Sequence, residues 1–111
     1  GYREFKGAFA ENYVLQSLST QSTVNLRYWT SNNSAEVDFL LQYDTHILPI
    51  EVKSGKSTSS RSLTLYNAEK HPILRIRYSD KELKLDDNLL NIPLYMADWT
   101  FALLDRVIAS L

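Results

Sequence analysis

Apolar and polar residues alternate in two neighbouring stretches near the middle of the chain, at residues 35–43 and 47–54. Such alternation predicts two β-strands that each bury one face. A two-residue loop at 44–45 would join them as a hairpin and would pair Tyr43 with His46. A three-residue loop would shift this pairing by one residue, and Asp-Thr is a weaker turn signal than Asn-Gly.

The two-residue loop brings charged side chains into facing positions. Asp38 then lies opposite Glu51, and Glu36 lies opposite Lys53. Like charges that face each other across a sheet repel, so two facing carboxylates indicate that a positive charge lies between them. This arrangement is typical of a divalent-metal site. The alternative is an exposed ion pair between Glu36 and Lys53, worth under ~1 kcal/mol, with the other two carboxylates solvated.

The remaining sequence predicts further strands and three helices around this hairpin. The apolar residues on the expected core side of the hairpin are Val37, Phe39, Leu41, Leu48, Ile50 and Val52. Strands are predicted at 24–30 and 72–79, a short extended segment at 94–96, and a charged loop with at most a short strand at 80–91. Helices are predicted at 3–18, from a serine-rich cap at 57–60 to about residue 70, and at 98–110 with Asp98 as N-cap. The order is α-β-β-β-α-β followed by a loop and a last helix, which is an α/β domain.

Glu11 interrupts the apolar stripe of the first predicted helix. The flanking apolar positions are Ala8, Val14, Leu15 and Leu18. An ionised carboxylate that faces a core lowers stability unless it is paired or bound to a metal. Glu11 therefore either meets an arginine, for which Arg27 is a candidate, or joins the carboxylates of the hairpin in one site.

Composition narrows the classes of function. The chain has 111 residues with 44% hydrophobic and 23% charged residues, which predicts a single domain over 1–111. No apolar run approaches the ~20 residues of a membrane span. The chain has no cysteine, which excludes disulfides and thiolate chemistry and fits a cytoplasmic location. Its net charge of −1 argues against indiscriminate binding of nucleic acid, so any such contact needs a local patch; Arg75 and Arg77 either flank the site or are solvated surface.

Several spaced motifs together resemble a known superfamily. The first predicted helix carries Gly-Ala-Phe-Ala-Glu-Asn-Tyr-Val at 7–14, and Tyr28-Trp29 follows. The hairpin carries Glu-Val-Asp-Phe at 36–39 and Ile-Glu-Val-Lys-Ser-Gly at 50–55. A helix bearing Glu, then Asp on the second strand, then Glu-x-Lys on the third, resembles the PD-(D/E)XK nuclease fold. The motifs are most similar to those of an uncharacterised domain found C-terminal to many prokaryotic AAA-type ATPases.

This resemblance implies a restriction-endonuclease-like core, in which a mixed sheet is flanked by helices and a C-terminal helix is added. It implies that Asp38 and Glu51 bind Mg²⁺ or Mn²⁺, and that Lys53 orients a water molecule or stabilises developing negative charge. In the same way, Glu11 would hold a metal-bound water or a second ion, and Glu36 would tune Lys53.

The resemblance also implies a function and partners. The expected activity is metal-dependent hydrolysis of DNA phosphodiester bonds, with DNA and the N-terminal ATPase domain of a longer chain as partners and with no membrane. The alternative is a catalytically silent accessory domain that binds DNA or protein, because a fold does not fix a function. In that case the carboxylates form a structural cation site or a salt-bridge network with Lys53. A third alternative is dimerisation through a patch on the last helix that includes Trp99, Phe101 and Leu104.

Overall fold

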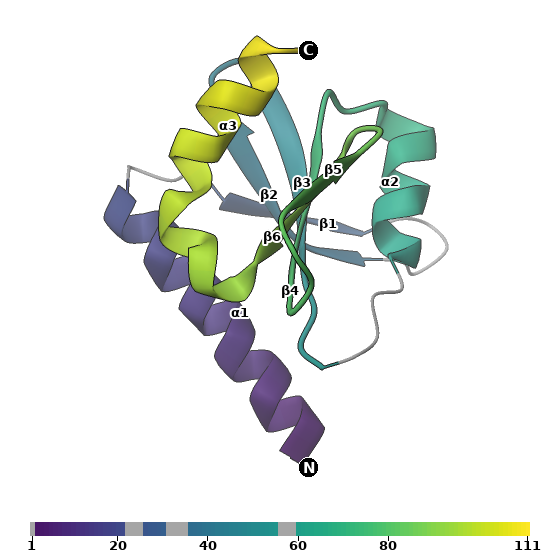
Figure 1. Ribbon diagram of the computed structural model, residues 1–111. Coiled ribbons are helices and arrows are strands. Elements are labelled where there is room, and N and C mark those ends of the chain that lie inside the picture. Colours follow the sequence, from purple (N-terminus) through teal and green to yellow (C-terminus); the bar gives the residue numbers. More distant parts are fainter. Residues whose placement is uncertain (1, 22–25, 31–35, 56–59) are drawn as a thin grey trace.

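In the computed structural model, a six-stranded sheet separates helices on its two faces (Figure 1). The structure describes residues 2–21, 26–30, 36–55 and 60–111, and for 2–5, 26–30 and 36 it describes the backbone alone. The helical elements are α1 (Tyr2–Gln21), α2 (Arg61–Lys70), the 3₁₀ helix η1 (Leu94–Trp99) and α3 (Thr100–Ala109). The strands are β1 (Leu26–Thr30), β2 (Glu36–Tyr43), β3 (His46–Val52), β4 (Arg75–Ser79), β5 (Lys84–Asp86) and β6 (Leu89–Pro93).

The sheet is mixed, with strand order β1-β2-β3-β4-β6-β5. β3, β4 and β6 run parallel to one another, and the remaining neighbours are antiparallel. The connection from β3 to the parallel β4 contains α2, as a parallel crossover requires. The expected α/β class, the α-β-β-β-α-β order, the flanking helices and the added C-terminal helix are all confirmed. No helix in the described part of the chain is long and apolar enough to cross a membrane.

Each face of the sheet buries its own core. The larger core lies between the sheet and α1, η1 and α3, and includes Val14, Leu18, Ile50 and Leu104, each fully buried. The smaller core lies under α2 on the opposite face (Figure 1). Its buried members are Val37, Leu40, Leu63 and Tyr66.

The register predicted from the two-residue loop is confirmed for the five pairs of the ladder, which do not include the predicted facing pairs Asp38–Glu51 and Glu36–Lys53. Tyr43 pairs with His46, and the same register continues to Phe39 and Ile50. Asp44 has a φ of 55°, the left-handed conformation that tight hairpin turns use. β3 begins one residue earlier than expected and ends at Val52, two residues before the expected end.

The expected core face of β2 is wrong at one position. Arg27 pairs with Leu40 but Trp29 pairs with Val37, so one residue of β1 opposes two residues of β2. This β-bulge at Asp38 and Phe39 shifts the alternation of β2 by one residue. Val37 therefore lies in the smaller core together with Leu40, while Phe39 and Leu41 lie in the larger one.

The first helix extends beyond the predicted 3–18 in both directions, and its buried stripe differs from the predicted one. Ala10, Val14 and Leu18 are buried, whereas Ala8 is exposed and Leu15 is only partly buried. Glu11 is also partly exposed, so it lies at the border of the stripe.

Expectations for three other segments also change. β4 begins at Arg75 instead of residue 72, because α2 ends with His71 in the left-handed conformation and residues 72–74 follow as a connection. The segment 80–91, expected to be mainly a loop, forms β5 and most of β6. The segment 94–96 is part of a 3₁₀ helix and is not extended. The predicted strand starts at 24 and 35 and the capping residues 57–59 lie outside the described residues.

The predicted cap of the last helix is also wrong. α3 begins at Thr100, and Asp98 instead accepts a hydrogen bond from the Ser17 hydroxyl of α1. The backbone N–H of Phe101 donates to Gln21 Oε1 at 3.2 Å, so a side chain from α1 satisfies the first turn of α3. The expected exposed patch of Trp99, Phe101 and Leu104 is reduced to Trp99, because Leu104 is buried and Phe101 stacks on Tyr43 with ring centroids 6.1 Å apart.

Candidate functional site

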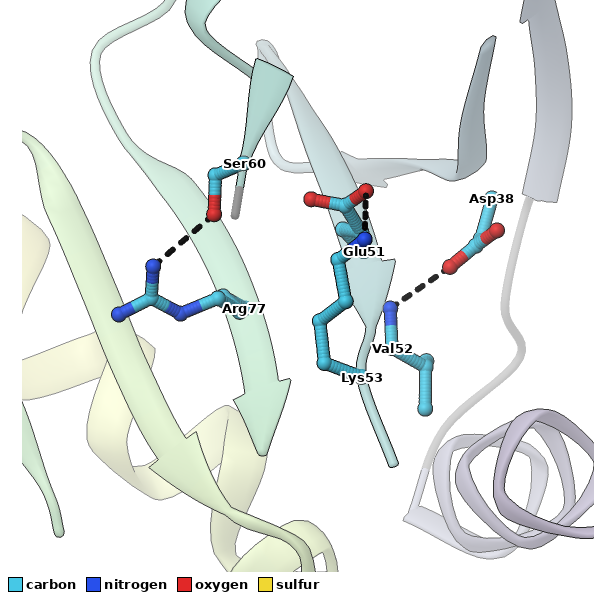
Figure 2. Close-up of polar contacts among 6 residues, drawn as sticks. All are labelled: Asp38, Glu51, Val52, Lys53, Ser60 and Arg77. Atoms are coloured by element: carbon cyan, nitrogen blue, oxygen red, sulfur yellow. Dashed lines mark hydrogen bonds and ion pairs between the residues drawn. The ribbon is translucent and has the colours of Figure 1, made fainter. Parts of the chain in front are cut away.

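Asp38 occupies the bulge of β2, where the strand leaves its regular pairing with β3. The last regular pair is Phe39 with Ile50, and beyond it Asp38 Oδ2 accepts a hydrogen bond of 2.7 Å from the backbone N–H of Val52. A carboxylate thus takes the place of a ladder carbonyl at the carboxyl end of β3. A bulge of this kind redirects a side chain locally, and bulges occur often beside active sites. The close-up view shows Asp38 directed at Val52 (Figure 2).

Glu51 of β3 and Lys53, the first residue after that strand, project on the face opposite to Val52. They are two residues apart in an extended segment, so both side chains leave the strand on one side. Lys53 Nζ lies 3.2 Å from Glu51 Oε1, and the Glu51 residue is only 7% exposed. Glu51 Oε2 is buried and has no hydrogen-bond partner among the described residues. A buried charged oxygen without a partner lowers the stability of the folded state, so Glu51 lowers the stability of this domain.

The surroundings of Glu51 both raise and lower its pKa. Burial raises the pKa of Glu51, and the nearby Asp38 raises it further. The positive charges of Lys53 and Arg77 oppose this increase, but the pKa remains above its usual value of 4.5. The carboxylate of Glu51 therefore lies among one negative and two positive side chains while it is largely removed from water.

Glu11 approaches the hairpin carboxylates from α1. Its pKa is raised by burial, by the negative charge of Asp38 and by a hydrogen bond to Asp38. The structure thus brings Glu11 beside a like charge. The side chain of Arg27, the alternative partner that the sequence suggests, lies outside the described residues. The structure therefore joins Glu11 with Asp38, and Asp38 with Glu51, in one continuous acidic group.

Glu36 is placed only by its backbone. It lies at the start of β2, where it pairs with Thr30 of β1. Its side chain lies outside the described residues, so the expected contact with Lys53 and the expected tuning role stay predictions.

Arg77 and Asn91 extend the site along the sheet in the direction away from Asp38. Arg77 of β4 pairs with Glu51 in the parallel ladder, and Asn91 of β6 pairs in turn with Arg77. Arg77 Nε donates to Asn91 Oδ1 and Nη1 donates to the Ser60 hydroxyl, both at 2.9 Å. Glu51 therefore lies between Arg77 and Asp38 (Figure 2).

Of the two arginines of β4 noted in the sequence, Arg77 flanks the site and Arg75 does not. Arg75 Nη2 and Nε both bond the Asn88 side chain, at 2.7 and 3.0 Å. Asn91 was missed, because a lone asparagine in an apolar segment gives no sequence signal of a role.

The donor set suits a hard divalent cation held by few protein ligands. Carboxylate oxygens are the ligands that Mg²⁺ and Mn²⁺ prefer, and Mg²⁺ commonly takes one or two of them and keeps several waters. Among the described residues, no three acidic or histidine side chains form a group that could hold one metal ion together. A cation here would therefore rest on Asp38 and Glu51, and the unpartnered Glu51 Oε2 is the atom that such an ion would satisfy.

Residues 6–96 match the family model described as a domain of unknown function, DUF4143. The match covers most of the chain, so the chain belongs to this family. A search of curated proteins gives no significant match. The family description names no activity, so membership of the family does not by itself assign a function to the chain.

Proposed function

We propose that this domain is a metal-dependent phosphodiesterase of the PD-(D/E)XK type that hydrolyses DNA. The observation that carries the proposal is the buried oxygen of Glu51, which has no partner in the described part of the chain and lies beside Asp38 and Lys53. Stability alone does not favour a desolvated carboxylate next to a second carboxylate, whereas a metal site requires both. Destabilising arrangements of this kind are frequent at functional sites.

In this proposal each residue has a distinct task. Asp38 and Glu51 hold a Mg²⁺ or Mn²⁺ ion, which when bound supplies a water of lowered pKa and neutralises charge on the phosphate. The Lys53 ammonium, which already lies 3.2 Å from Glu51, orients the attacking water or stabilises the developing negative charge. Glu11 accepts a hydrogen bond from water at the acidic group, because its carboxylate reaches Asp38 from α1.

The partners are proposed from the same motifs. DNA is the substrate class, and a longer chain would supply an N-terminal AAA-type ATPase domain that remodels or moves it. This assignment is supported by motifs that resemble those of domains attached to such ATPases. The motifs are Glu-Val-Asp-Phe, Ile-Glu-Val-Lys-Ser-Gly and the helix that carries Glu11.

The test is a cleavage assay with duplex, single-stranded and branched DNA in Mg²⁺ and in Mn²⁺. We expect metal-dependent cleavage that falls at least about 100-fold in Asp38→Asn and in Lys53→Met. Lys70→Met, which removes an exposed lysine of α2, is the matched control and should cleave like the unmodified protein. Cleavage that persists in both site variants, or no cleavage of any substrate by the domain and by its full-length chain, contradicts the proposal.

A second candidate is a catalytically silent accessory domain of the ATPase. The observation in its favour is that Lys53 and the Val52 N–H already contact the two carboxylates. In a silent domain, Lys53 is a structural counter-charge. Lys53→Met should then lower the free energy of unfolding, because Glu51 loses its ion pair, while Mn²⁺ should leave the melting temperature of the unmodified domain unchanged.

A further inference from the structure

A cleft of about 700 Å³ opens beside the candidate site, on the side of Arg77 away from Asp38. Its lining residues come from β4, β6, β5 and the turn that precedes β5. The cleft residues that carry the argument are Arg77, Asn91, Leu89, Lys81 and Lys84. Because Arg77 pairs with Glu51 in the sheet, the cleft and the candidate metal site share a boundary.

The guanidinium of Arg77 is fixed at this boundary. Its Nε donates to Asn91 Oδ1 and its Nη1 donates to the Ser60 hydroxyl. Both acceptors are neutral, and the positive charge of Arg77 also acts on its ladder neighbour Glu51, whose pKa it lowers. An oriented guanidinium is well suited to bind phosphate oxygens, because its N–H groups form a planar fork.

Asn91 also bonds the turn before β5 that lines the cleft. Its side-chain nitrogen donates to the carbonyl oxygens of Lys81 and Glu82 at 3.0 and 2.9 Å. Its oxygen accepts from Arg77 and, at 2.6 Å, from the Ser79 hydroxyl. One buried amide therefore uses its full hydrogen-bonding capacity to fix both the arginine and the turn.

The lining indicates the kind of ligand. The positive side chains Arg77, Lys81 and Lys84 alternate with three acidic ones, so their formal charges cancel. The acidic lining residues are Asp80, Glu82 and Asp86. Such a balance does not favour a polyphosphate, but it allows a single phosphate at Arg77. Leu83 and Leu89 add apolar surface on which a sugar or base can lie.

We propose that this cleft is a nucleotide subsite, in which Arg77 binds the phosphate next to the one cleaved and the cleft holds the attached nucleoside. The proposal deepens the proposed function and rests on it for the identity of the adjoining reaction site. In this proposal, the sheet edge at β5 orients the DNA strand that enters the site.

The test is an NMR titration of the ¹⁵N-labelled protein with thymidine 5′-monophosphate, with thymidine and inorganic phosphate as separate probes. We expect the largest amide shifts at 81–85 and at Leu89, and weaker binding of each separate probe. Arg77→Gln should weaken binding of the nucleotide at least about tenfold. Arg106→Gln, an exposed arginine of α3, is the matched control and should bind as the unmodified protein does.

Lys84→Gln provides a second variant, because this exposed strand residue packs against no core and its loss should not unfold the domain. We expect it to weaken binding severalfold. Shifts that cluster away from the cleft, or affinity in Arg77→Gln and Lys84→Gln equal to that of the unmodified protein, overturn the subsite. No detectable binding of the nucleotide at millimolar concentration overturns it as well.

The titration is done without a divalent metal, so its result is separate from that of the cleavage assay. A protein that binds the nucleotide in the cleft but never cleaves DNA retains the subsite and loses the proposed function. A protein that cleaves DNA with an unchanged KM in Arg77→Gln retains the function and loses the subsite.

Discussion

The substitution Glu51→Gln should make the metal-free protein more stable at neutral pH. Glu51 is 7% exposed, and one of its carboxylate oxygens has no hydrogen-bond partner among the described residues. Glutamine has nearly the same shape and keeps a carbonyl oxygen as acceptor for Lys53. It removes the negative charge, whose desolvation is the unfavourable contribution. A functional carboxylate of this kind should oppose stability.

The magnitude of the gain depends on two opposing contributions. The cost that the substitution removes is the extra penalty for burying a charged oxygen instead of the neutral amide nitrogen of glutamine, which is about 1–3 kcal/mol because unpartnered charged groups cost more than neutral ones. The ion pair with Lys53 offsets at most about 1 kcal/mol, because the lysine side chain is 30% exposed and water screens the interaction. The net gain for the variant is therefore about 1 kcal/mol, which corresponds to an increase in Tm of about 4 °C for a domain of this size.

The pH dependence has a definite sign. The pKa of Glu51 is raised in the folded state by burial, so its contribution to stability is fully present below the usual value of 4.5 and is lost as the pH rises through the folded pKa. The advantage of Glu51→Gln should therefore be largest at about pH 8 and should disappear below about pH 4.5.

The assay is thermal unfolding in EDTA at several pH values. Glu69→Gln, the same change at an exposed position of α2, is the control and should stay within about 0.5 kcal/mol of the unmodified protein. A Glu51→Gln variant that is less stable than the unmodified protein at about pH 8 would refute the reasoning, because Glu51 would then contribute net stability through Lys53.

Substitutions at three further positions test the packing around the site. Asp38→Ala leaves the Val52 N–H unpaired and should lower the free energy of unfolding in urea by about 1–3 kcal/mol. Asp38→Asn keeps an acceptor and should lower it less. Equal losses in the two variants would contradict the assigned hydrogen bond. Leu63→Ala leaves a cavity at a fully buried position under α2 and should lower the free energy of unfolding by about 2–5 kcal/mol in the same assay. A decrease well below about 1 kcal/mol would show that this core does not hold α2. Asn91→Leu removes the hydrogen bonds that hold the turn at Lys81, so amide hydrogen exchange of residues 81–83 should become faster. Unchanged exchange would contradict this role of Asn91.

The hairpin at the centre of the site could be predicted from the sequence because pairing is fixed once the loop is known. A two-residue loop sets the pairs as far as Phe39 and Ile50, and alternation fixes which of their side chains share a face. The bulge at Asp38 could not be predicted in this way. It depends on β1 supplying one residue where β2 supplies two, and nothing in Glu-Val-Asp-Phe indicates that mismatch.

The C-terminal third of the chain was harder to predict for a different reason. All three residues of β5 are exposed and four of the five residues of β6 are buried, so neither strand alternates. α3 begins without a local cap because Gln21, eighty residues earlier in the chain, accepts the hydrogen bond from Phe101. Contacts over such sequence separations leave no local pattern. Asn91 was missed for the same reason, because its four partners come from β4 and the turn before β5.

The measurement that tests the central claim most directly is calorimetric titration of Mn²⁺ into the protein and into Asp38→Ala, Glu51→Gln and Glu69→Gln. The proposed site predicts saturable binding to the unmodified protein and to the exposed control Glu69→Gln, and loss of binding in both site variants. Absence of binding to the unmodified protein, or equal binding to all four proteins, would contradict a metal site at Asp38 and Glu51. Absence of binding would favour Lys53 as the permanent counter-charge of a silent domain.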